Sequence, residues 1–191
     1  MGNITQQELT KAIDKMENIV VGWFAKDHML LGVWSMVEKV VDAKTKTLAI
    51  NSRSEPPAIL YNPKFINSLD QETLEMVLGA ECIKILLRHP TSRLKEPLEV
   101  SGLSSSITVD QIVMKDINSQ LKDIIPTPEK YGISEKDSNH ERYFRLLMEK
   151  FDQTQKNMDK QFGSQGGKDK KDQDKGQGKS KNQNKGQGEN E

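Results

Sequence analysis

The chain has 191 residues and carries 28 basic and 28 acidic side chains, so its formal net charge is zero. This balance excludes a strongly basic nucleic-acid-binding domain, and no apolar run approaches the roughly 18 residues of a transmembrane helix. The single cysteine excludes an intramolecular disulfide and favours a reducing compartment. The N-terminus lacks the pattern of a secretory signal, so we expect a cytoplasmic protein with no membrane partner.

A change of composition near residue 152 divides the chain into a domain over residues 1–152 and a tail over 153–191. The tail contains nine lysines and six acidic residues, and the sequence Lys-Gly-Gln-Gly occurs in it twice. It holds too little apolar surface to offset the entropy cost of ordering, so we expect it to be disordered. Binding to nucleic acid needs a clear excess of positive charge, which the mixed charges of the tail do not provide. We therefore favour a spacer or solubilising role for the tail.

The first part of the domain predicts two helices followed by two strands. Apolar residues at helical spacing predict helices over 4–24 and 27–42. The period then changes to that of strands over 45–51 and 58–62, which are close enough in sequence to pair antiparallel.

The second part of the domain predicts three helices. The longest covers 69–89, where apolar residues occupy almost every face, as is typical of a buried central helix. The Ser68–Gln71 spacing predicts a capping box at its start, and Pro90 predicts its end. A polar loop over 91–106, a helix over 108–121 and a last helix over 139–151 follow. The predicted class is α+β, mostly helical, with one small antiparallel strand pair.

The central helix carries the most specific pattern, Gly-Ala-Glu-Cys-Ile-Lys-Ile-Leu-Leu-Arg-His-Pro over 79–90, with Arg93 beyond it. Around it lie the strand sequence of 59–65, the Asp-Ile-Asn of 116–118, the Tyr-Gly-Ile of 131–133 and the Glu-Arg-Tyr-Phe of 141–144. In order and spacing, residues 20–151 resemble the putative metallopeptidase domain family, a bacterial zincin-like family. The resemblance implies a zincin-like, hydrolase-like domain whose helix carries His-Glu-x-x-His.

The resemblance places Ala80 and Lys84 at the two zinc-ligand positions. A site of this type needs imidazoles one turn apart, and the intervening Glu activates the metal-bound water. Alanine has no donor atom and a protonated lysine repels a cation, so only Glu81, a vestigial general base, is kept. Asp116 matches a family position for a third ligand. We therefore expect no metal or other cofactor and a pseudoenzyme rather than an enzyme.

Three functions follow as alternatives. The favoured one is a protein-binding or scaffold module that uses the family's groove for a protein or peptide partner; the resemblance also implies, by association, an ATPase partner. The second is an active zinc peptidase with displaced ligands. The third is a nucleic-acid or assembly accessory protein that acts through the tail.

The pairing of Glu81 with Lys84 leaves two interpretations open. The residues are three apart and share a helix face. Either the Lys84 ammonium replaces the charge of the metal in a buried site, or both side chains reach solvent in a groove.

The remaining reactive and aromatic residues predict structural roles. We expect Cys82 to be a core residue, since it lies in an apolar helix with no histidine within a turn. His89 is expected to interact with the last carbonyls of the central helix, and His28 and His140 are expected at the surface. The cluster of Trp23, Phe24 and Trp34 predicts core packing.

Overall fold

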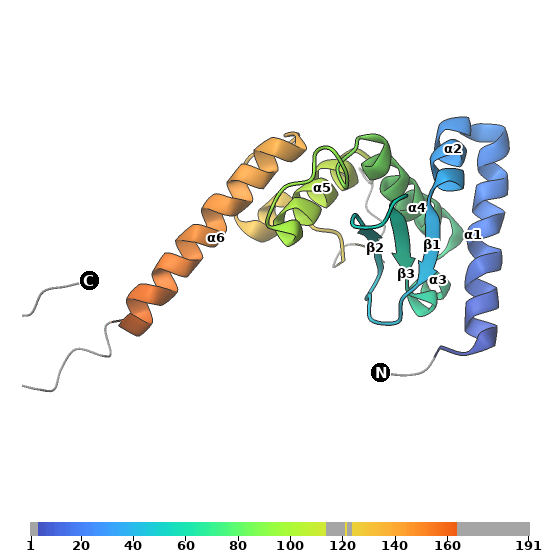
Figure 1. Ribbon diagram of the computed structural model, residues 1–191, viewed down its shortest axis with the longest axis horizontal. Coiled ribbons are helices and arrows are strands. Elements are labelled where there is room, and N and C mark those ends of the chain that lie inside the picture. The colour runs from blue at the N-terminus through green and yellow to red at the C-terminus, as the bar shows by residue number, and fades with distance from the viewer. Residues whose placement is uncertain (1–3, 114–120, 122–123, 164–191) are drawn as a thin grey trace, which may run out of the picture. The chain divides into compact units, whose positions relative to one another are not determined.

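The computed structural model describes residues 4–113, 121 and 124–163 and confirms an α+β fold. Figure 1 shows the elements in chain order: α1 (Gln6–Lys26), α2 (His28–Met36), β1 (Glu38–Val41), β2 (Leu48–Asn51), β3 (Ala58–Tyr61), α3 (Pro63–Ser68), α4 (Gln71–Leu86), α5 (Leu98–Val113), the 3-10 helix η1 (Pro128–Tyr131) and α6 (His140–Gly163). No helix among the described residues is long and apolar enough to cross a bilayer.

The predicted first helix is confirmed as α1, and it begins as its sequence indicates. Thr5 accepts a hydrogen bond from the Glu8 amide while the Glu8 carboxylate accepts one from the Thr5 amide, which completes a capping box. Its apolar face buries Trp23, whose ring meets Trp34 of α2 edge-on at 6.1 Å between centroids. The predicted core packing is wrong for Phe24, because 70% of this residue is exposed.

The sheet has three strands rather than the predicted antiparallel pair. Its order is β1-β3-β2, with β2 antiparallel to β3, as predicted, and β1 parallel to it. The helix predicted over 27–42 is therefore wrong beyond Met36, where Val37 is already extended. β-branched residues such as Val40 and Val41 suit either a buried helix face or a strand, and pairing with β3 decides in favour of the strand.

The turn before the central helix contains α3, which the sequence reading missed. Asn62 caps α3 by accepting a hydrogen bond from the Lys64 amide at 3.0 Å, and Pro63 occupies its first turn. The central helix, α4, then begins after Asp70, whose side chain accepts from the Thr73 amide at 2.7 Å. The predicted Ser68 cap is wrong, because the Ser68 hydroxyl donates to the Phe65 carbonyl instead.

Helix α5 begins at Leu98, inside the segment predicted to be a polar loop. Its serines have low helix propensity, but their hydroxyls find partners within the fold. Ser104 donates to the Ser101 carbonyl at 2.9 Å, and Thr108 donates to the Ser104 carbonyl at 2.8 Å. Of the helix predicted over 108–121, residues 108–113 belong to α5 and residues 114–120 lie outside the described residues.

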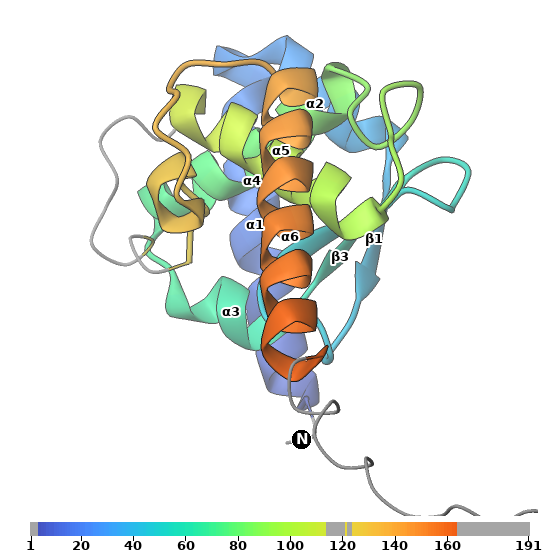
Figure 2. The same ribbon diagram turned by 90° about the vertical axis from the view of Figure 1, so that its left-hand side faces the viewer.

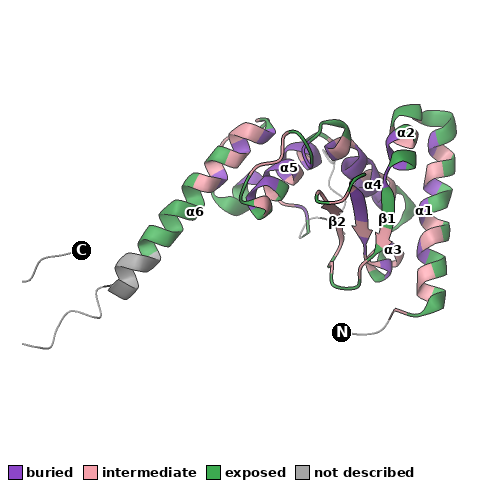
Figure 3. Ribbon diagram, in the orientation of Figure 1, coloured by how far each residue is buried: buried purple, intermediate pink, exposed green. Residues whose placement is uncertain are grey.

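The sheet shares the main hydrophobic core with α1, α2 and α4, to which β3 contributes Ile59 and Tyr61. In Figure 2 the strands β1 and β3 lie to one side of α4 and α1. Helix α4 is buried over most of its length, as predicted, and Figure 3 shows it in the buried colour, whereas α1 alternates between buried and exposed. In this arrangement α4 packs against α5 and shares the main core with β3.

The last helix is present but longer than predicted. Helix α6 continues past residue 151 to Gly163, so residues 153–163, assigned from the sequence to the disordered tail, are helical. This stretch lacks proline and contains three Gln and two Lys before Gly163, so a helix already begun can propagate through it. The rest of the predicted tail, 164–191, lies outside the described residues.

Candidate functional site

The polar centre of the domain is the Lys84 ammonium group with two carboxylates and a hydroxyl around it. Lys84 Nζ lies 2.8 Å from Glu81 Oε1 on the preceding turn of α4. From α5, Ser106 Oγ lies 3.1 Å away and Asp110 Oδ1 3.5 Å away. We call these four residues the Lys84 cluster.

The Lys84 cluster is buried. Lys84 is 6% exposed, Glu81 8% and Asp110 6%. Of the two interpretations left open by the sequence, this placement supports the buried ion pair and not a pair that is solvated in a groove. Charged groups with so little exposure remain ionised only when opposite charges lie close to them, and here one ammonium lies beside two carboxylates.

The environment shifts the pKa values of this cluster in definite directions. Burial alone would lower the pKa of Lys84, but the charges of Glu81 and Asp110 outweigh it and raise the pKa, so Lys84 is charged at neutral pH. Burial raises the pKa of Asp110 to about 6, while the Lys84 charge opposes that rise. The Lys84 ammonium therefore stabilises the ionised form of carboxyl groups that burial alone would favour in their protonated, neutral form.

Asp110 is the member of the Lys84 cluster that the sequence analysis did not identify. A single acid within the apolar stretch Ile107–Val113 was the available signal, because a charged residue on a buried helix face requires a partner. The residue predicted as a third ligand position, Asp116, lies outside the described residues.

The two zinc-ligand positions do not present a donor set for a metal. Ala80 is 1% exposed and packs in the main hydrophobic core, where it offers no donor atom. Lys84 places a positive charge between the carboxylates that would have to attract a cation. Among residues 4–113, 121 and 124–163, no three His, Cys, Asp or Glu side chains converge on one possible metal position. The described residues thus do not fit the zinc ion that the His-Glu-x-x-His pattern implies.

A cavity of about 530 Å³ opens above the cluster, between β2 and α5. Glu81 and Lys84 line its floor, residues 48–53 form the β2 side, and Ser101, Gly102, Ser105 and Ser106 form the α5 side. We call it the β2–α5 cavity. A mixed apolar and hydroxyl lining of this size is typical of a site for a small ligand or a segment of peptide.

His89 reaches the wall of this cavity because α4 ends in a Schellman motif. Arg88 adopts a left-handed conformation with φ 61°, and the amides of Arg88 and His89 donate to the carbonyls of Ile85 and Lys84. This turn directs the chain toward α5, where His89 Nδ1 lies 2.8 Å from Ser105 Oγ. The predicted contact of the imidazole with the last helix carbonyls is therefore wrong.

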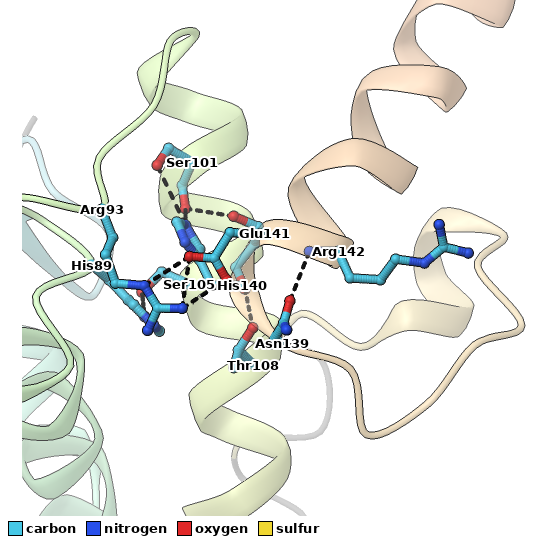
Figure 4. Close-up of polar contacts among 10 residues, drawn as sticks. His89, Arg93, Ser101, Ser105, Thr108, Asn139, His140, Glu141 and Arg142 are labelled. Carbon is cyan, nitrogen blue, oxygen red and sulfur yellow. Dashed lines mark hydrogen bonds and ion pairs between the residues drawn. The ribbon is translucent and has the colours of Figure 1, made fainter.

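The histidines are otherwise placed as follows. His28 is exposed, as predicted. His140 was predicted at the surface and is fully buried, because its ring stacks on His89 at 4.4 Å between centroids. Figure 4 shows the two imidazoles between α5 and the start of α6, beside Ser101 and Ser105.

Cys82 is buried in the main core, as predicted. Burial, with a contribution from the Glu81 charge, raises the pKa of its thiol to about 12, so almost no thiolate is present at neutral pH.

We expect the folded protein to resist a thiol reagent such as Ellman's reagent and to react with one equivalent when unfolded in guanidinium chloride. Rapid labelling of the native protein would show that α4 opens far more readily than its burial indicates.

The comparisons with known proteins give one match. Residues 5–191 match the family model described as the putative metallopeptidase domain. No curated protein and no solved structure matches the chain.

Proposed function

Because the chain belongs to the putative metallopeptidase domain family, we propose that it is a non-catalytic member that uses the β2–α5 cavity to bind a protein or peptide segment. The observation that carries this proposal is the Lys84 cluster. An ammonium group bonded to Glu81 and facing Asp110 lies where a peptidase of this kind requires a second imidazole. The Glu81 carboxylate is hydrogen-bonded to a lysine, and neither residue 80 nor residue 84 supplies the imidazole that this type of hydrolysis needs to hold a metal and activate water.

The β2–α5 cavity supports a role in binding, because it lies beside a strand that an extended peptide could join. Strand β2 is an edge strand, since it pairs with β3 on one side only within the described sheet, and its residues line the cavity. An edge strand presents backbone donors and acceptors to which an extended peptide can add as a further strand. The side chains of such a peptide would enter the space above Glu81 and Lys84.

The first test is the metal content of the purified protein. We expect less than a tenth of an equivalent of zinc after gel filtration, measured by inductively coupled plasma mass spectrometry, and no chelator-sensitive cleavage of casein. Near-stoichiometric zinc, together with proteolysis that is lost in Glu81→Gln, would instead establish the peptidase with displaced ligands.

The second test fills the cavity. Gly102 lies on the cavity wall, and a Cβ at this position meets no atom within 4 Å, so we chose Gly102→Phe to place a ring in the cavity without a clash at Cβ. With peptides selected on the protein from a random phage-display library, we expect the substitution to weaken binding at least tenfold, measured by fluorescence polarisation.

Gly22→Phe is the matched control for this test. Gly22 is also a helical glycine with open space at its Cβ, but it lies on α1 and does not line the cavity. Selected peptides that bind both variants as tightly as the original protein would place the binding surface elsewhere.

A further inference from the structure

Two buried imidazoles join the end of α4 to the start of α6. His89 is 2% exposed and His140 0%, and their rings stack at 4.4 Å with an interplanar angle of 19°. His89 follows α4, whereas His140 is the first residue of α6 (Figure 4). The stacked pair is the His89–His140 pair.

The hydrogen bonds of the pair suit two neutral rings. His140 Nε2 lies 3.2 Å from the Ser101 carbonyl oxygen, which can only accept, so this nitrogen carries the hydrogen and donates it. His140 Nδ1 is buried without a partner. A second proton on His140 would therefore be placed on a nitrogen that has neither an acceptor nor water to receive it.

The charged groups that face the pair oppose a positive imidazole. Lys84 comes from α4, Arg93 and Lys95 from the segment before α5, and Glu141 from α6. Glu141 is held by Arg93 in a two-point ion pair with both N–O distances at 2.7 Å, so its charge is already compensated. From α5 the pair meets the hydroxyls of Ser101 and Ser105.

The part of α6 that follows the pair is held by a small core of its own. Tyr143 and Leu147 of α6 pack with Ile133 and with Val100 and Ile107 of α5, in a cluster separate from the main core. The same stretch of α5 carries Ser101 and Ser105, which line the β2–α5 cavity together with His89.

We propose that the His89–His140 pair is an acid-operated latch, whose protonation releases residues 140–154 of α6 from α5 and opens the wall of the β2–α5 cavity. An imidazolium ion at either position is repelled by the flanking cations, and protonation of both rings adds repulsion between the two stacked imidazoles. At His140 it also faces the positive end of the α6 dipole. Release of α6 hydrates both rings and removes these penalties. The latch depends only on contacts within the chain and not on the proposed peptide binding.

The pH window of the latch follows from the histidines. Burial, reinforced by His140 and Arg93, lowers the pKa of His89 to about 4, and burial also lowers the pKa of His140. In the released state the rings regain a pKa of about 6.5. Above that pH both states are neutral and the latch is closed. As the pH falls from about 6.5 towards 4, the released state takes up more protons and is favoured.

Protonation of Asp110 affects stability in the opposite direction to protonation of the histidines, so the test must measure the protection of α6 itself. Its pKa is raised to about 6 by burial, so acidification below that pH protonates it in the folded state and favours the closed domain. A global melting curve would mix the two effects. The Asp110→Asn background removes this second titration.

Amide hydrogen exchange of the full-length protein, read by mass spectrometry and corrected for intrinsic rates, tests the latch. Between pH 7 and pH 5 we expect protection of residues 140–154 to fall by about tenfold or more, while protection of α4 changes far less. In the double variant His89→Asn/His140→Gln, the Asn amide can accept or donate near the Nδ1 position of His89 and the Gln amide can donate near the Nε2 position of His140, but neither side chain can be protonated. In this variant, α6 should lose its pH dependence.

The third histidine of the chain supplies the control. His28 is exposed, so His28→Gln should behave as the original protein does. Equal protection of α6 at both pH values, or a pH dependence that persists in the double variant, overturns the latch. If the double variant fails to fold at pH 7, the imidazole NMR titration of the original protein decides: rings that charge while α6 amides stay protected refute the proposal, and rings that charge only as those amides open support it.

Discussion

Replacing Lys84 by alanine is expected to lower the free energy of unfolding by about 3–5 kcal/mol, because the substitution leaves buried carboxylates without their counter-charge. Lys84 lies 2.8 Å from Glu81 and 3.5 Å from Asp110, and each of the three side chains is nearly shielded from water. The measurement is urea unfolding at pH 7, followed by far-ultraviolet circular dichroism.

Neutral substitutions should rescue much of this loss. Lys84→Ala combined with Glu81→Gln and Asp110→Asn removes the unpaired charges, so its unfolding free energy should recover toward that of the original protein. Lys64→Ala is the matched control, because the Lys64–Glu8 pair spans 3.9 Å at the surface and such pairs contribute about 1 kcal/mol at most. A loss for Lys84→Ala no larger than that of the control would refute the idea that Lys84 neutralises the cluster.

Placing imidazoles at residues 80 and 84 should create a zinc site in the double variant. In Ala80→His/Lys84→His, two imidazoles lie one turn apart with Glu81 between them, as His-Glu-x-x-His requires. Ala80 is packed in the core, so the larger side chain should cost about 1–3 kcal/mol without metal. Free zinc at about 100 times its Kd should restore about 2.7 kcal/mol by binding only the folded state. The original protein should show no change in Tm with zinc.

Two carboxylates are candidates for the third zinc ligand of this site. Asp110 lies beside the Lys84 position in the structure, whereas Asp116 is the position that the family resemblance implies. Adding Asp110→Asn or Asp116→Asn to the double-histidine variant and titrating zinc by calorimetry identifies which carboxylate binds. A folded double-histidine variant that takes up no zinc would mean that α4 does not present its residues as a zincin helix does.

The sequence was most reliable where a pattern is local. The capping box at Thr5 and the apolar positions of α1 predicted that helix closely, and apolar residues on every face predicted the buried position of α4. These inferences need only helix geometry and neighbours within a few turns.

Other features depended on partners distant in sequence. Residues 38–41 form a strand because β3 pairs with them, although their apolar spacing also suits a helix. The serines of α5 are helical and buried because backbone carbonyls, His89 and the Lys84 ammonium accept or donate their hydrogen bonds. Neither outcome follows from local propensity, because tertiary contacts outweigh it.

The sequence by itself thus determined the class of the fold and its family. Only the tertiary structure decided that Asp110 completes the cluster around Lys84 and that His140 is buried against His89. The physical reason is the same in both cases. The surroundings of a buried charge or imidazole consist of the groups that the packing of α4, α5 and α6 brings within a few ångströms. Asp110 lies 26 residues from Lys84 in the chain, and His140 lies 51 residues from His89.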